Sequence, residues 1–115
     1  MSQFVLLLHE PASLSPGVSP EEMQAIIQRY KAWSTALAER GHLLGGDKLQ
    51  DGTGRVLRNS KSQVSVTDGP YAETKEVIGG FFRIEAESYE QAVALARDCP
   101  HLAFGPVEIR QVDVV

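Results

Sequence analysis

The stretch "QFVLLLH", residues 3–9, constrains the fold of this chain most strongly. Its run of apolar residues at 4–8 predicts a strand that is apolar on both faces, because successive side chains of a strand point to opposite sides. A sheet built on such a strand must be covered on each face. We therefore expect packing partners for both sides of the sheet.

A long helix is expected over residues 20–40. Ser19 supplies an N-cap, Pro20 suits the first helical position, and Glu22 stands three residues after the cap. Gly41 then provides a stop signal. One apolar stripe, at spacings of three and four residues, runs along this helix: Met23, Ile26, Ile27, Tyr30, Trp33 and Leu37.

The middle of the chain predicts a β-meander. Residues 42–50 are typical of a strand, 51–54 ("DGTG") of a hairpin turn, and 55–58 of a return strand. A second turn is expected at 59–62 and an alternating strand at 63–67.

Another strand is predicted at 79–88, "GGFFRIEAES", by its alternating pattern. Gly79 and Gly80 ahead of it indicate a bulge or a close backbone approach rather than a phosphate cradle, because no helix N-terminus follows them. The two faces of the strand carry Phe82, Ile84 and Ala86 on one side and Phe81, Arg83 and Glu85 on the other.

A second helix begins after Ser88, an N-cap with Gln91 three residues on, and Pro100 closes it. Residues 106–115 form the last strand. The length of 115 residues indicates one domain, residues 1–115. Two helices can cover one face of a four- or five-stranded sheet, so the other face is expected to meet a second copy of the chain. This predicts an α+β ferredoxin-like sandwich that forms a homodimer through its sheet face.

Charge and composition exclude several classes of protein. The net charge is −4, the pI is near 5.3, and the 11 Lys and Arg residues are scattered, so nucleic acid is not an expected partner. The apolar start is too short for a signal peptide or a membrane span. Cys99 is the single cysteine, which excludes an internal disulfide and fits a reducing compartment, so we expect a cytoplasmic protein. The three histidines lack metal-site spacing, and we expect neither a metal nor another cofactor.

Several short motifs resemble the DGPF-domain branch of the YCII-related family. They are "DGPYAETKE", "GGFFRIEAES", "CP" and "VEIRQV", together with "FVLLLH" and "RGHLLGG". Tyr71 stands where the family's name motif has Phe. The resemblance covers nearly the whole chain and implies the dimeric α/β-barrel form of the ferredoxin-like fold, here with an inserted β-hairpin and with two helices on one face of an antiparallel sheet.

The resemblance also bears on chemistry. Outside the DGPF branch, the family pairs a His from the first helix with an Asp near the end of the second. Those two slots hold Tyr30 and Cys99 in this chain, with Asp98 one position away. The implied His–Asp dyad is therefore absent.

Asp68, in the segment "TDGPYAETKE", allows two interpretations. Pro70 lacks the N–H of the usual Asx-turn, so the carboxylate can cap a short turn through the N–H of Tyr71. Alternatively it faces a pocket as an acid, a base or a ligand anchor. Lys75 beside it would favour an anion-binding role.

His9 closes the first strand, where a dimer cleft would lie, and is either a hydrogen-bonded strand-end residue or a titrating one. The leading hypothesis is a cofactor-free lyase, isomerase or dehalogenase acting on a small aromatic or acidic metabolite. His9 and Asp68 would be its acid–base pair, and Tyr30, Tyr71 and Lys75 would contact the ligand. The alternatives are a non-catalytic dimeric binding or regulatory module and a purely structural subunit.

Overall fold

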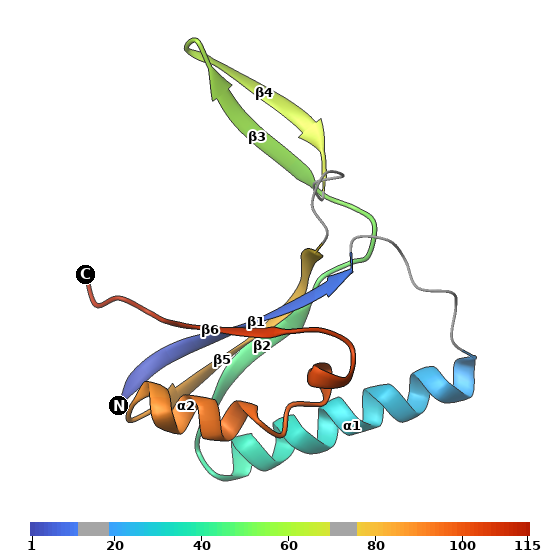
Figure 1. The fold of residues 1–115 in the computed structure, drawn as a ribbon, viewed down its shortest axis with the longest axis vertical. Coiled ribbons are helices and arrows are strands. Elements are labelled where there is room, and N and C mark those ends of the chain that lie inside the picture. The colour runs from blue at the N-terminus through green and yellow to red at the C-terminus, as the bar shows by residue number, and fades with distance from the viewer. Residues whose placement is uncertain (12–18, 70–75) are drawn as a thin grey trace.

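Four strands form one antiparallel sheet, and two helices pack against it (Figure 1). The computed structural model describes residues 1–11, 19–69 and 76–115. The order of strands in the sheet is β2-β5-β1-β6. The elements of this body are β1 (Ser2–Pro11), α1 (Pro20–Glu39), β2 (Leu43–Lys48), β5 (Glu76–Ala86), α2 (Tyr89–Ala96), a 3₁₀ helix (Pro100–Ala103) and β6 (Val107–Gln111).

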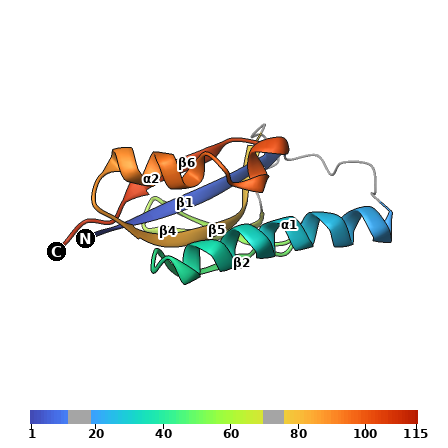
Figure 2. The ribbon, with the colours of Figure 1, turned by 90° about the horizontal axis from the view of Figure 1, so that it is seen from below.

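Both helices lie on the same face of the sheet (Figure 2). The core between them and the sheet contains Phe4, Leu6 and Ile84, each at most 1% exposed. On the helix side, Leu37 of α1 and the small residues of α2 close this layer. Trp33 of α1 packs edge-on against another aromatic ring of the sheet, Phe82, at 5.0 Å between ring centroids. The predicted α+β ferredoxin-like architecture is confirmed.

Strand β1 divides its apolar residues between the two faces. Phe4, Leu6 and Leu8 are buried under the helices, whereas Val5 and Leu7 on the opposite face are only half-buried. This second face, which we call the open sheet face, is the one for which the sequence predicts a second copy of the chain. The homodimer stays a prediction.

The helix boundaries follow the local signals. The Ser19 hydroxyl accepts the N–H of Glu22 at 3.1 Å, and the Ser88 hydroxyl accepts the N–H of Gln91, also at 3.1 Å. Gly41 ends α1 with φ of +79°, a conformation that glycine adopts without a Cβ penalty. Neither helix in the described residues is long and apolar enough to cross a membrane.

The predicted meander is wrong in its pairing. β2 pairs with β5, whereas β3 (Arg55–Ser60) and β4 (Gln63–Asp68) form a separate two-stranded sheet. β2 gains more by lying beside the core strand β5, where Leu43 is opposite the fully buried Ile84, than by pairing with an exposed neighbour. The inserted β-hairpin itself is present, and it projects away from the body (Figure 1).

The turn of this hairpin is also shorter than predicted. Strand pairing continues to Ser60 and Gln63, so only Lys61 and Ser62 form the turn. Both have positive φ, +51° and +67°, as a two-residue type I′ turn requires.

The predicted irregularity at Gly79 and Gly80 is confirmed as a bulge between β1 and β5. Leu8 pairs with Gly80, but His9 pairs with Ile78, so Gly79 is the extra residue. A Cβ at Gly79 would collide with the carboxylate of Glu10. The missing side chain at Gly79 therefore leaves room for the Glu10 side chain above the backbone of β5.

Candidate functional site

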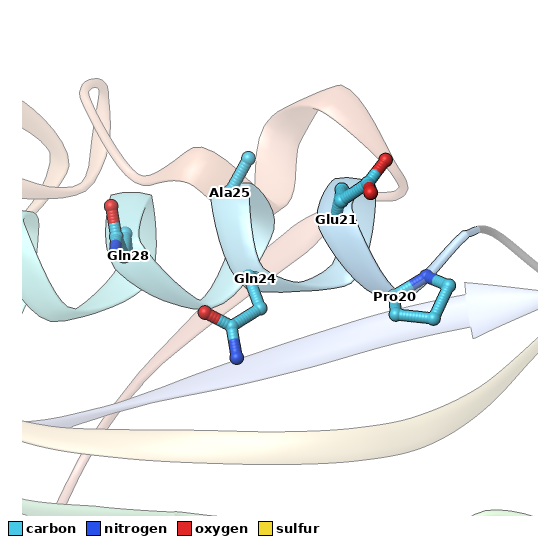
Figure 3. Close-up of a pocket in the computed structure, with 5 residues that line it drawn as sticks. All are labelled: Pro20, Glu21, Gln24, Ala25 and Gln28. Carbon is cyan, nitrogen blue, oxygen red and sulfur yellow. The ribbon is translucent and has the colours of Figure 1, made fainter.

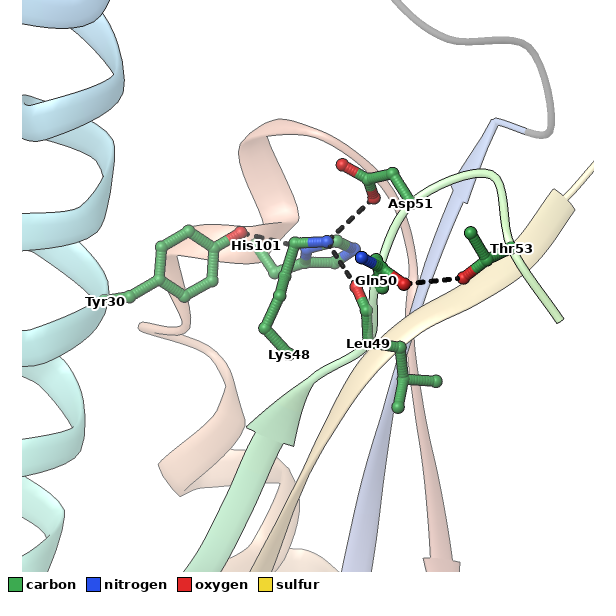
Figure 4. Close-up of polar contacts among 7 residues, drawn as sticks. All are labelled: Tyr30, Lys48, Leu49, Gln50, Asp51, Thr53 and His101. Atoms are coloured by element: carbon green, nitrogen blue, oxygen red, sulfur yellow. Dashed lines mark hydrogen bonds and ion pairs between the residues drawn. The ribbon is translucent and has the colours of Figure 1, made fainter.

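A hydrogen-bonded chain of three groups joins α1, the 3₁₀ helix and the end of β1. The Tyr30 hydroxyl lies 3.0 Å from Nδ1 of His101, and Nε2 of His101 lies 2.6 Å from the backbone carbonyl of His9. Figure 4 shows the first of these contacts. His101 is only 4% exposed.

The His9 carbonyl fixes the tautomer of His101. A carbonyl oxygen only accepts, so Nε2 of His101 carries the hydrogen and donates it. In the neutral ring, Nδ1 then has a free lone pair, which accepts the hydrogen of the Tyr30 hydroxyl. Both ring nitrogens of this buried histidine are therefore hydrogen-bonded.

The local sequence explains how His101 reaches this position. Pro100 starts the 3₁₀ helix just after α2, and the N–H groups of Phe104 and Gly105 both bond the carbonyl of His101, at 2.8 and 3.0 Å. Gly105 lies directly against β1, so close that a Cβ at this position would collide with the His9 carbonyl. A glycine is needed for this close approach.

Burial controls the ionisation of the tyrosine. Desolvation is the main cause that raises the pKa of Tyr30 to about 12, and the Cys99 thiol and the Glu10 carboxylate raise it further, against a smaller opposing effect of Arg29. Tyr30 is therefore a neutral phenol at physiological pH. Burial also raises the pKa of the Cys99 thiol, which is 2% exposed.

His9 takes part in a second polar cluster through its side chain. Its Nε2 lies 2.9 Å from one oxygen of Glu108, and the other oxygen lies 3.7 Å from the Arg110 guanidinium. Glu108 is opposite Leu7 in the strand register, so this cluster lies on the open sheet face. The backbone and the ring of His9 thus serve two different groups.

The predicted partner of His9, Asp68, lies elsewhere. Asp68 ends β4 and makes an exposed ion pair with Arg55 at 3.4 Å. Within one chain, no hydrogen bond or ion pair joins Asp68 to His9, although the structure describes both residues. Tyr71 and Lys75 lie outside the described residues, as does the turn that Asp68 would cap. Of the predicted site residues that the structure describes, Tyr30 and the backbone of His9 are the two that are joined, through His101.

The sequence did not predict His101 as a site residue. The segment "CPHLAFGP" contained the signal, because Pro100 can start a short helix that turns the next side chain back toward α1. The second slot of the family's His–Asp pair falls on Cys99 by the resemblance, two positions before His101. Glu10 and Glu108 were missed as well, since their neighbours depend on strand register.

A small cavity of about 190 Å³ lies beside Glu10 and Gly79, under the loop of residues 49–56. Internal contacts hold this loop: Lys48 Nζ donates to the Leu49 carbonyl and to Asp51, both at 2.8 Å, and Thr53 donates to Gln50 at 3.1 Å (Figure 4). Glu10, which lines this cavity, is also one of the groups that raise the pKa of Tyr30.

A wider hollow of about 460 Å³ lies along the first turns of α1 (Figure 3). Pro20, Glu21, Gln24, Ala25 and Gln28 line it. All belong to one helix, so no groups from different elements converge on it, and we do not place the site there. Among the residues that the structure describes, no three His, Cys, Asp or Glu side chains are grouped to hold a metal ion.

The strand order and the single helical layer define an α+β protein of the ferredoxin-like class. The chain belongs to the YCII-related domain family, whose family model matches residues 1–114. An uncharacterised protein of Rhizobium meliloti (strain 1021) is 31% identical over 110 residues, covering 93% of this chain and 89% of that protein. The narrower resemblance to the DGPF-domain branch stays a prediction.

Among solved structures, the chain is similar to 5-chloro-2-hydroxyhydroquinone dehydrochlorinase of Burkholderia phenoliruptrix AC1100 in complex with 2,5-dihydroxybenzoquinone. The TM-score is 0.47 and the sequence identity 17%, over 96% of this chain and 93% of that chain.

Proposed function

We propose that this chain is a cofactor-free enzyme, a lyase, isomerase or dehalogenase, that moves a proton on a small aromatic or acidic metabolite. Tyr30 and His101 are its proton-transferring pair. The observation that supports this is the Tyr30–His101–His9 chain, in which a buried imidazole of fixed tautomer accepts from a phenol. This is the arrangement of a base held in orientation by a third group.

The pKa of Tyr30 decides how the pair works. Because that pKa is raised to about 12, the phenol does not act as a pre-formed phenolate. It acts as a relay: Tyr30 receives a proton from the substrate while its own proton passes to Nδ1 of His101. The His9 carbonyl, which accepts from Nε2, stabilises the imidazolium that forms. The proton then returns to a different atom in an isomerisation, or stays behind when a leaving group departs with its electron pair.

A homodimer through the open sheet face belongs to the same proposal. In the register of the strands, Arg83 and Arg110 flank Val5 in one row, and Asp47 and Glu108 lie in the next row. Val5, Leu7 and Phe81 form an apolar centre between these charges. A two-fold axis can place the basic row of one copy against the acidic row of the other. A cytoplasmic location remains part of the proposal too.

The second candidate is a non-catalytic ligand-binding or regulatory module. The absence of the family's His–Asp pair favours it, since Tyr30 and Cys99 occupy the two expected slots. Tyr71 and Lys75 remain proposed ligand contacts under either function, and Asp68 remains a proposed acid, base or ligand anchor.

Proton exchange separates the two candidates. Small aromatic and acidic carbonyl compounds are incubated with the protein in D₂O and followed by proton NMR. We expect exchange, isomerisation or release of a leaving group with the wild type, loss of it with Tyr30→Phe, and retention with Tyr89→Phe, which removes an exposed hydroxyl. Compounds that raise the melting temperature but are never changed would favour the binding module.

A further inference from the structure

The β3–β4 hairpin is amphipathic, and its apolar face is exposed. Leu57 is opposite Val66 and Asn59 is opposite Val64 in the register, so Leu57, Val64 and Val66 share one face. Their side chains are 64%, 64% and 60% exposed. The opposite face carries mostly polar residues: Val56, Arg58, Ser60, Gln63, Ser65 and Thr67.

Local preferences alone do not account for this hairpin. A two-stranded hairpin is marginal in water without packing against other elements. Its turn places Lys61 and Ser62 at positive φ, where glycine, asparagine or aspartate are normally found. Figure 1 shows the hairpin extended away from the sheet and the helices of its own chain. The apolar face therefore needs a covering surface from outside the chain.

Charge indicates what that surface is. Residues 55–68 contain Arg55, Arg58 and Lys61 against the single acid Asp68, in a chain whose net charge is −4. The hairpin is thus basic and the rest of the chain acidic, which makes the hairpin of one copy complementary to the body of another.

The position of the hairpin points the same way. It is inserted between β2 and β5, which are neighbours at one edge of the sheet. It projects from the body on the side of the sheet away from the two helices (Figure 1), which is the side of the open sheet face through which we propose the homodimer. We propose that the β3–β4 hairpin is a docking arm that places its Leu57–Val64–Val66 face on an acidic surface of a second copy of this chain. This inference rests on the homodimer and not on the Tyr30–His101 chemistry.

Thiol labelling tests the docking directly. Val66→Cys introduces a thiol on the apolar face, and Ser65→Cys introduces a matched thiol on the polar face of the same strand. The native Cys99 is buried and gives a slow background. Maleimide labelling is followed over a dilution series, with the association state measured by sedimentation velocity at each concentration. We expect Val66→Cys to be protected in the dimer and to label faster on dilution, and Ser65→Cys to label rapidly throughout.

Association is then measured in a double variant. Leu57→Thr/Val66→Thr places β-branched residues, which suit strands, at both positions but removes the apolar contact. We expect its dimer dissociation constant to rise at least tenfold. The control, Ser65→Thr/Thr67→Ser, keeps the composition of the polar face and should match the wild type. Raising the salt concentration should weaken the wild-type dimer.

Several outcomes would contradict the proposal that the β3–β4 hairpin docks on a second copy. Equal labelling of the two thiols at every concentration, or protection of Val66→Cys in a monomer, excludes docking on a second copy. A Leu57→Thr/Val66→Thr variant that associates like the wild type also excludes docking by the hairpin. If Leu7→Arg dissociates the dimer of that variant, the homodimer forms through the open sheet face without a contribution from the hairpin. A wild-type protein that is monomeric at all concentrations excludes both the docking of the hairpin and the homodimer. The Tyr30–His101 proposal concerns groups within one chain, so the proton-exchange assay still tests it.

Discussion

The Tyr30 hydroxyl lies 3.0 Å from Nδ1 of His101, although 71 positions separate the two residues in the sequence. The contact is made by two helical elements that the sheet holds in place, α1 and the 3₁₀ helix after α2. It gives a buried histidine a neutral donor on one side, while the backbone of β1 supplies an acceptor on the other. The measurable consequences of this arrangement extend to stability, ionisation and backbone packing.

Tyr30→Phe should destabilise the fold by about 1–3 kcal/mol, because it leaves Nδ1 of the buried His101 without its donor. A change of about 1 kcal/mol corresponds to a fall of roughly 4–8 °C in Tm for a domain of this size. Thermal and urea unfolding measure both quantities. Tyr89→Phe, which removes the acceptor of the Gln111 N–H at an exposed site, should cost less than Tyr30→Phe. Equal losses in the two variants would contradict the assigned role of Tyr30.

The ionisation of Tyr30 should appear as a loss of stability at high pH. The ordinary tyrosine pKa of 10.0 rises to about 12 in the fold, so between these values the unfolded chain releases a proton that the folded chain keeps. The stabilisation is complete below about pH 10 and is lost as the pH rises toward 12. Urea unfolding over this range should show the advantage of the wild type over Tyr30→Phe shrinking. In a phenolate absorbance titration, a Tyr30 signal that appears near pH 10 would exclude the shift.

Gly105→Ala should destabilise the chain by roughly 1–3 kcal/mol, as overpacking of a close backbone contact does. The new methyl group would meet the His9 carbonyl, and relief would move that carbonyl away from His101. Gly45→Ala is the matched control, because a Cβ there meets only the Arg83 guanidinium at an ordinary 3.7 Å. Denaturant midpoints should separate the two variants, and a silent Gly105→Ala would mean that the backbone tolerates a wider gap at this point.

Asp68 should contribute little through its ion pair with Arg55, since both side chains are well exposed. Pairs of this kind are worth about 0–1 kcal/mol. If Asp68 also caps the following turn, Asp68→Ala should cost about 0.5–2 kcal/mol, whereas Asp68→Asn should be nearly silent. A loss of ligand-induced thermal shift in Asp68→Asn, with unchanged stability, would instead support a ligand contact. Comparison of the two variants with and without ligand decides between these roles.

The parts of the fold that depend on local chemistry could be predicted from the sequence. Ser19 and Ser88 cap the two helices through contacts only three residues long, and the alternation of β5 fixes which side chains face the core. The pairing of β2 could not be predicted in this way, because a local turn signal competes with a distant core strand, and only burial decides the outcome.

The site was harder to predict for the same reason. Tyr30 was recognised on the apolar stripe of α1, but its partner depends on how far the chain turns after Pro100, and a shift of two residues separates His101 from Cys99. The two-residue turn at Lys61 and Ser62 could not be predicted from the sequence either. Neither residue favours positive φ, so nothing local indicated a turn as short as two residues.

The acceptor that fixes the tautomer of His101 is a main-chain carbonyl, and this affects which mutations can reach the site. Replacing the side chain at His9 alters the ring contact with Glu108 but leaves the carbonyl in place. Substitutions of the His9 side chain should therefore leave the hydrogen bond that orients the His101 ring in place. The His9 carbonyl would be displaced by an insertion or deletion that shifts the register of β1 at the bulge, or by a larger residue at Gly105. The site therefore depends more on the spacing of residues along the chain than on the identity of the side chain at position 9.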